Sequence, residues 1–133
     1  MIKYNLLKIK DYFLKILGMK TNSDKKNVVN ELLDCMEAEL NALSLWSKTS
    51  LPEDYINQAS DVPFGCNVLD FHEWLQHIFY VRMKALITAD QDLPSNMAIT
   101  PMAQYVYRDE LERHGKLIEI LQKLDHAICN GSE

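Results

Sequence analysis

The sequence predicts an all-α protein: a small helical bundle of three long helices and one short helix, with an additional N-terminal amphipathic helix. Three observations predict this class. The 133 residues include only four Gly and four Pro, whereas a many-stranded sheet needs frequent turns. Leu, Ile, Met, Ala, Glu and Lys, which favour helices, are abundant. Several stretches repeat apolar residues at the three- and four-residue spacing of one helix face.

The composition is that of one soluble globular domain, with 47% hydrophobic and 25% charged residues. No apolar run approaches the ~18 residues of a membrane span, and lysines interrupt the apolar N-terminus, so we expect no secretory signal. The three cysteines, Cys35, Cys66 and Cys129, show no paired spacing. They therefore indicate neither a disulfide framework nor a zinc site, and they favour the reducing cytoplasm.

The charges are distributed unevenly along the chain. Residues 1–26 contain seven Lys and two Asp and carry +5, whereas residues 27–133 contain seven Lys or Arg and 17 Asp or Glu and carry -10. An acidic main domain repels a phosphate backbone, so we expect no direct nucleic-acid binding. We divide the chain into residues 1–22, a basic amphipathic extension, and residues 23–133, the bundle.

The first expected helix, residues 2–19, is amphipathic and basic. Its apolar side consists of Ile2, Leu6, Ile9, Phe13, Ile16 and Leu17. Two interpretations stay open: the helix packs on its own domain or on a second copy, or it contacts a membrane surface or a partner. In the second case the contacting residues are Lys3, Lys8, Lys10, Phe13 and Lys15. Gly18 and the polar residues that follow predict a helix end and a hinge.

The second helix is expected to start at Ser23 or Asp24, either of which can be an N-cap, and to end at about Ser47. Its inward stripe is Val29, Leu32, Leu33, Met36, Leu40 and Leu43. Residues 48–69 contain two Pro and one Gly without a clear period, which predicts a long connection with one short helical turn around 53–58. We expect Phe64 and Leu69 to cover an open end of the core.

The remaining helices begin at recognisable caps. Asp70 followed by Glu73 forms a capping-box pattern, and the helix should run to about Ala89. Thr100 and Pro101 suit the N-cap and first position of a short helix over 101–109. The last helix, 109–129, should end at Asn130 and Gly131, and Asp125 lies within its apolar face. That face is Leu111, His114, Leu117, Ile118, Leu121, Leu124 and Ile128.

One charge stands on the apolar side of the helix that starts at Asp70. Arg82 shares the stripe of Phe71, Leu75 and Ile78. We predict that it forms an ion pair with Asp125 inside the bundle, or with Glu110 as a second choice. Removing one partner of such a buried pair costs about 3–5 kcal/mol. The alternative is that Arg82 binds an anionic ligand between helices.

The sequence predicts no metal or cofactor. Glu73 with His77, and Glu110 with His114, have the four-residue spacing of helical metal ligands. The first pair is expected to face away from the core, however, and only the second points inward. Ser, Cys and His occur without the strained turn that presents a nucleophile. We therefore predict no catalytic residues and no enzyme.

Residues 63–83, PFGCNVLDFHEWLQHIFYVRM, resemble the motif of the YqcC-like family of small bacterial helical proteins. The matching residues are Pro63, Phe64, Leu69, Phe71, Glu73, Trp74, Leu75, Gln76, Phe79, Arg82 and Met83. Further matches follow in the same order: Leu93, Pro94, Ile99, Pro101, Met102, Ala103, Leu121, Leu124 and Asp125. The resemblance covers about residues 28–128. Val81 departs from it, because the family usually has Pro there and Val lets the helix continue.

The resemblance implies an all-α bundle and little about activity. The family carries the label tRNA pseudouridine synthase C by association, yet true pseudouridine synthases resemble a larger mixed α/β catalytic domain. We therefore predict a non-enzymatic protein-interaction module with an unknown protein partner, a second copy included. The alternatives are a membrane-surface adaptor that uses residues 1–20 and an accessory of an RNA-modifying enzyme.

Overall fold

The computed structural model describes residues 22–130, and all regular secondary structure in that range is helical. The α-helices are α2 (Asn22–Ala42), α3 (Glu53–Ser60), α4 (Phe71–Trp74), α5 (Val81–Thr88), α6 (Thr100–Val106) and α7 (Leu111–Asn130). A short 3-10 turn, η1 (Pro63–Gly65), follows α3, and a π-helical segment, η2 (Leu75–Tyr80), joins α4 to α5. The all-α class is confirmed, and α3 contains the short turn expected around 53–58.

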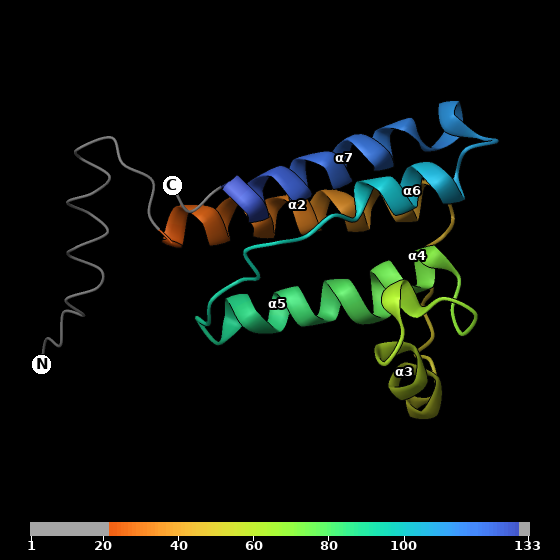
Figure 1. The fold of residues 1–133 in the computed structure, drawn as a ribbon, viewed down its shortest axis with the longest axis horizontal. Coiled ribbons are helices and arrows are strands. Elements are labelled where there is room, and N and C mark those ends of the chain that lie inside the picture. Colours follow the sequence, from red (N-terminus) through yellow and green to blue (C-terminus); the bar gives the residue numbers. More distant parts are fainter. Residues whose placement is uncertain (1–21, 131–133) are drawn as a thin grey trace, which may run out of the picture.

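The two longest helices, α2 and α7, lie side by side (Figure 1). Helix α6 packs along α7, and the α4–η2–α5 helix lies on the same side of the α2–α7 pair as α6, with the Phe71 ring of α4 5.9 Å from the Tyr107 ring at the end of α6. Helix α3 lies at the end where α4 begins. The helix predicted over residues 2–19 and the cap predicted at Gly131 lie outside the described residues.

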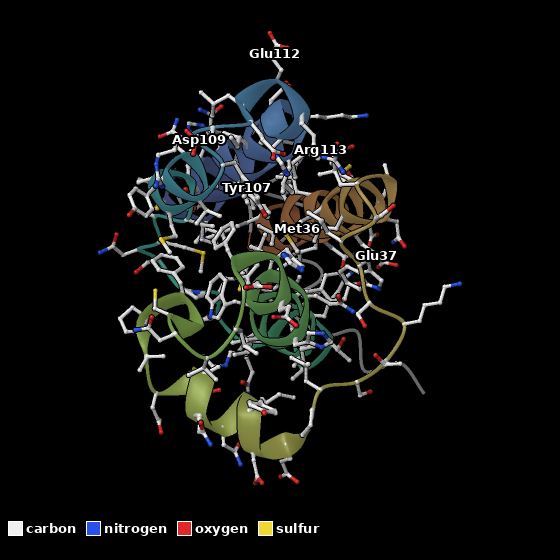
Figure 2. All side chains as sticks on the ribbon, turned by 90° about the vertical axis from the view of Figure 1, so that its right-hand side faces the viewer. Met36, Glu37, Tyr107, Asp109, Glu112 and Arg113 are labelled. Atoms are coloured by element: carbon white, nitrogen blue, oxygen red, sulfur yellow. The ribbon has the colours of Figure 1, made fainter. Side chains whose placement is uncertain are left out.

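The core lies between α2, α7 and the α4–η2–α5 helix. Its fully enclosed side chains are Val29, Leu33, Met36, Leu40, Leu75, Met83, Ile99, Leu117, Leu121, Leu124 and Ile128. Figure 2 shows Met36 and Tyr107 inside the bundle and Glu112 projecting away from it. The inward faces predicted for α2 and α7 are confirmed except at two residues. Leu32 is only partly buried and faces the outer side of the α2–α7 pair, and Leu111, the first residue of α7, is 51% exposed.

Helix α2 ends at Ala42 instead of the predicted Ser47. Ser44 adopts a left-handed φ of 61°, and its N–H donates to the Asn41 carbonyl at 3.0 Å. The Leu45 N–H donates to the Leu40 carbonyl at 2.8 Å. These two bonds form a Schellman cap, which normally uses Gly. Because a serine occupies the left-handed position here, the sequence carried no clear stop signal.

The π-helical segment explains why the sequence pattern predicts the wrong face for Arg82. In a regular α-helix, a residue four positions along the chain lies about 40° further around the axis, so three such steps move a side chain about 120° away from the starting face. Here Phe71, Leu75, Phe79 and Met83 are nevertheless all buried, because the wider turn of η2 absorbs that drift. The shifted register brings Met83 into the core and leaves Arg82 exposed.

Candidate docking groove

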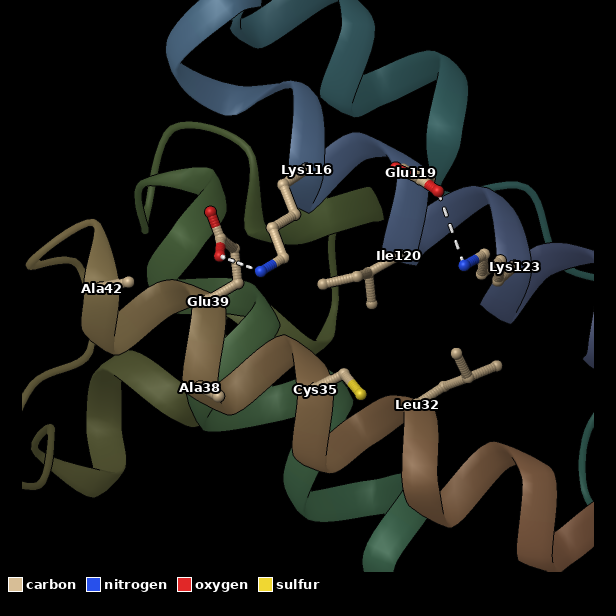
Figure 3. A pocket seen from close by; sticks show the side chains of 9 residues that line it. All are labelled: Leu32, Cys35, Ala38, Glu39, Ala42, Lys116, Glu119, Ile120 and Lys123. Carbon is tan, nitrogen blue, oxygen red and sulfur yellow. Dashed lines mark ion pairs between the residues drawn. The ribbon is translucent and has the colours of Figure 1, made fainter.

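A groove between α2 and α7 is the candidate functional site. The groove has a volume of about 370 Å³ and is shown from close by in Figure 3. Leu32 and Cys35 of α2 and Ile120 of α7 form its apolar floor (Figure 3). The other lining residues are Ala38, Glu39, Ala42, Lys116, Glu119 and Lys123.

The sequence of α2 produces the groove because this helix carries two apolar stripes. One stripe fills the core, and the second consists of Leu32, Cys35, Ala38 and Ala42. Val28, which is 47% exposed, continues the second stripe toward the N-terminus of α2. The residues of the second stripe from Cys35 onward are small, so they leave space beside Ile120 that a larger side chain would fill.

Charged side chains border this apolar floor. Lys116 Nζ lies 3.9 Å from Glu39 Oε1, and Lys123 Nζ lies 3.5 Å from Glu119 Oε1 (Figure 3). The two lysine side chains are 76% and 61% exposed. The Glu119 side chain is 62% exposed, so its pair with Lys123 contributes only tenths of a kcal/mol and Glu119 can accept a new cationic partner at little cost. The Glu39 side chain is only 12% exposed, so Glu39 adds negative charge beside the groove but is largely covered.

The groove was not predicted from the sequence. The signal lay in the spacing of Val28, Leu32, Cys35, Ala38 and Ala42, which repeats at three and four residues beside the core stripe. Cys35 is exposed and lines the groove. Exposed Cys66 lies in the connection after η1, outside the groove.

The motif shared with the YqcC-like family serves mainly to hold the fold together. The ring centroids of Phe64 and Trp74 are 5.1 Å apart, and those of Phe64 and Phe71 are 6.3 Å apart. This aromatic cluster covers the end of the core, as expected for Phe64. The φ of Phe64 is 55°, a left-handed conformation that turns the chain so that Phe64 packs against the core.

Two polar motif residues bind backbone instead of a ligand. The buried Gln76 side chain accepts a hydrogen bond from the Ser47 N–H at 2.8 Å and donates one to the Ser47 carbonyl at 2.7 Å. It thereby fixes the chain that leaves α2. Glu73 Oε1 accepts a hydrogen bond from the Asp70 N–H at 2.9 Å, which confirms the predicted capping box.

Asp125 also binds backbone, so its predicted ion pair with Arg82 is wrong. Its carboxylate accepts hydrogen bonds from the N–H groups of Ile99 and Thr100 and from the Thr100 hydroxyl at 2.7 Å. Thr100 is the first residue of α6 and Ile99 is its N-cap, one residue earlier than predicted. The second-choice partner fails too, since the Glu110 side chain is 63% exposed and lies beside His114.

Arg82 itself is exposed and forms no hydrogen bond or ion pair within residues 22–130. It extends from the outer side of the α4–η2–α5 helix. The alternative in which Arg82 binds an anion between helices is also wrong, because the side chain does not face the interior. Among the other motif residues, Met83 is buried, Met102 is half-buried and Pro101 is exposed at the start of α6.

The histidines of the two four-residue pairs have separate roles. The His114 ring stacks on Tyr107 with centroids 3.9 Å apart, and His114 Nδ1 lies 2.9 Å from the Glu110 carbonyl oxygen. His77 Nε2 is enclosed without a hydrogen-bond partner among the described residues, and burial lowers the pKa of His77. Over residues 22–130 no three His, Cys, Asp or Glu side chains converge as a metal site would require.

Residues predicted to contact a membrane or a partner lie outside the described range. These are Lys3, Lys8, Lys10, Phe13 and Lys15, and the proposed boundary between residues 22 and 23 stays a prediction. Among the helices of residues 22–130, none is long and apolar enough to cross a bilayer.

The fold is that of a small helical bundle, and its two longest helices form an open apolar groove between them. Residues 28–127 match the model of the family described as tRNA pseudouridine synthase C, and the chain belongs to this family. A protein of Haemophilus influenzae, described as uncharacterized, is 27% identical over 84 residues, which are 63% of this chain and 77% of the relative.

A solved structure has the same fold. The solution NMR structure of protein YqcC from E. coli superimposes with a TM-score of 0.72 at 24% identity and covers 82% of this chain and 92% of its own. Together with the family match, this similarity confirms the resemblance to the YqcC-like family.

Proposed function

We propose that this chain is a non-enzymatic protein-interaction module whose groove between α2 and α7 binds an amphipathic helix. The observation that carries the proposal is the open apolar floor formed by Leu32, Cys35 and Ile120. A helix that presents one apolar stripe can lie in such a groove and contact both walls. The small side chains of Ala38 and Ala42 allow its backbone to approach α2 closely.

The expected partner helix is basic on its polar side. Residues 27–133 carry a net charge of -10, which attracts cationic partners over distances of about a Debye length. Glu119 stands exposed at the groove border, where a lysine of a bound helix can reach it, and the largely covered Glu39 adds negative charge beside the groove. The apolar floor supplies the affinity, and the charges favour this class of partner over acidic helices.

Several candidate chemical groups already have structural contacts, which supports a non-enzymatic role. Asp125 binds the start of α6, Glu73 caps α4, and the buried His114 ring stacks on Tyr107. Cys129 is hydrogen-bonded to the Met97 backbone, with its Sγ 3.2 Å from the carbonyl oxygen.

A synthetic amphipathic peptide, with Leu on one side and Lys on the other, tests the groove. We expect the full chain to bind the fluorescein-labelled peptide saturably, and Ala38→Glu or Ala42→Glu to weaken binding about tenfold or more. The matched control is Ala85→Glu, at an exposed position of α5 outside the groove. Circular dichroism melts establish that all three variants are folded.

The sign of the effect separates groove binding from simple charge attraction. An added Glu strengthens non-specific attraction to a basic peptide, whereas in the groove it opposes apolar contact. Binding that is unchanged or tighter in Ala38→Glu would overturn the proposal. So would equal weakening by Ala85→Glu.

A second candidate function, an accessory of an RNA-modifying enzyme, is favoured by the description of the matched family. In this case the chain changes the activity of a pseudouridine synthase without having activity of its own. Pseudouridine formation by a purified tRNA pseudouridine synthase, measured with and without the full chain, tests it. Pseudouridine formed by the chain alone would contradict the non-enzymatic proposal.

A further inference from the structure

The position of the groove relative to the start of α2 identifies a candidate occupant within the chain. The exposed stripe of α2 begins at Val28 and continues through Leu32 and Cys35 to Ala42. At 1.5 Å per residue, Leu32 lies about 15 Å and Ala38 about 24 Å along the helix from Asn22. The segment before α2 therefore joins this helix at its N-terminal end, and the exposed stripe runs from that end into the groove.

The preceding segment has a matching length and pattern. A helix of residues 2–17 would be about 24 Å long, and residues 18–21 leave four residues for a reversal of direction. If it ran back along α2, it would extend from the level of Asn22 to that of Ala38. Its apolar side is Ile2, Leu6, Ile9, Phe13, Ile16 and Leu17.

The charges of the two parts are complementary. Residues 2–17 contain four Lys and one Asp and carry +3, and residues 27–133 carry -10. The Glu119 side chain is 62% exposed and lies 3.5 Å from Lys123, so Glu119 is available to a lysine of a docked helix, whereas the Glu39 side chain is only 12% exposed. A helix with an apolar side and lysines elsewhere is the class of ligand that the groove is proposed to bind.

We propose that residues 2–17 form an amphipathic helix that docks into the α2–α7 groove of the same chain. This inference rests on the proposed function, because it names the chain's own segment as the helix bound there. A tethered segment has an effective concentration of about millimolar, so an external helix must displace it to bind. The groove is then a self-covered site that a partner opens by competition.

Cys35 is a natural reporter, since it lines the groove. Leu6 of a docked helix would lie near the level of Cys35, about 17 Å from Leu17. In a Cys66→Ser background, we expect Leu6→Cys to form an intrachain disulfide with Cys35 under mild oxidant. Lys8→Cys, on the opposite side of the segment, is the matched control and should form it several-fold more slowly. Peptide mapping identifies the bonded pair.

Thiol labelling supplies a second readout without new cysteines. In the full chain, Cys35 should react with a maleimide several-fold more slowly than exposed Cys66, which serves as an internal reference. Ile9→Asp, on the apolar side of the segment, should raise the Cys35 rate toward that of Cys66. Lys8→Asp changes the charge by more but leaves the apolar side intact, so it should raise this rate less.

The outcomes separate this inference from the proposed function. A disulfide between two chains instead of within one would assign the occupant to a second copy and overturn docking in cis. Equal disulfide rates for Leu6→Cys and Lys8→Cys, with Cys35 as reactive as Cys66, would also overturn it. A third outcome would assign residues 2–17 to a membrane. In that case the full chain floats with phosphatidylserine vesicles and Ile9→Asp does not, while Cys35 of the full chain is fully reactive when no vesicles are present.

Peptide binding completes the separation. If residues 2–17 occupy the groove, Ile9→Asp should tighten binding of the synthetic peptide several-fold, because the internal competitor is weakened. If Ile9→Asp leaves this affinity unchanged while Ala38→Glu still abolishes binding, docking in cis is wrong and the interaction module stands.

Discussion

Asp125 of α7 holds the first residue of α6, since its carboxylate lies 2.8 Å from the Thr100 N–H and 2.7 Å from the Thr100 hydroxyl. The same carboxylate accepts the Ile99 N–H at 3.0 Å. The first N–H groups of a helix have no partner within it, so a side chain from another helix here replaces the local cap. Asp125 thus joins two helices that are separated by the turn at Tyr107–Glu110.

We predict that Asp125→Ala destabilises the protein by about 2–3 kcal/mol, because it leaves a partly buried helix start without acceptors. Asp125→Asn keeps one acceptor oxygen and should cost less. The control is Gln122→Ala, on the exposed side of α7, expected within about 0.5 kcal/mol of wild type. Urea unfolding measures the difference, and hydrogen exchange should accelerate at Ile99 and Thr100. A cost for Asp125→Ala no larger than that of Gln122→Ala would contradict the assigned role.

Periodicity in the sequence predicted the helices whose inward stripe follows 3.6 residues per turn, as the buried residues of α2 and α7 show. It failed where the backbone leaves that period. The π-helical turn before Arg82 changed which residues face inward, and the left-handed cap at Ser44 ended α2 without glycine. The groove was missed because the exposure of Ala38 and Ala42 depends on where α7 lies, which a single helix pattern does not specify.

The exposure of Arg82 leads to a prediction opposite to that of a buried ion pair. We expect Arg82→Leu to change the free energy of unfolding by less than about 0.5 kcal/mol, as at other exposed sites without partners. The neighbouring Met83→Ala should cost about 2–5 kcal/mol, because Met83 is only 2% exposed in the core. Thermal or urea unfolding of the two variants compares them directly. A loss of several kcal/mol in Arg82→Leu would show that the π-helical register is wrong.

The cap of α2 offers a stabilising substitution. Ser44 has a φ of 61°, where a side chain is strained and glycine is not. We expect Ser44→Gly to stabilise the protein by about 0.5–1 kcal/mol, with part of the gain offset by the greater freedom of glycine in the unfolded chain. Asp90 also has a left-handed φ, of 54°, but its carboxylate forms an ion pair with Lys26, whose Nζ lies 2.8 Å from Asp90 Oδ1. Asp90→Gly should therefore gain less, and a destabilised Ser44→Gly would contradict the Schellman geometry.

Two tyrosines predict a loss of stability at alkaline pH. Burial, together with the hydrogen bond and charge of Glu37, raises the pKa of Tyr80 from 10.0 to about 12, and burial with the charge of Asp70 raises the pKa of Tyr107 to about 12.

Because the folded state disfavours both phenolates, their contribution to stability is full below pH 10 and is lost as pH rises through about 12. At pH 7 the two Phe variants should differ. Tyr80→Phe removes a 2.7 Å hydrogen bond to Glu37 and should cost about 1–2 kcal/mol, whereas Tyr107→Phe removes an enclosed hydroxyl without a partner among residues 22–130 and should cost nothing or stabilise. Urea unfolding at pH 7, 9 and 11 measures both effects, and each variant should lose less stability between pH 9 and 11 than wild type does. Identical slopes in all three proteins would show that neither phenol is held in its neutral form by the fold.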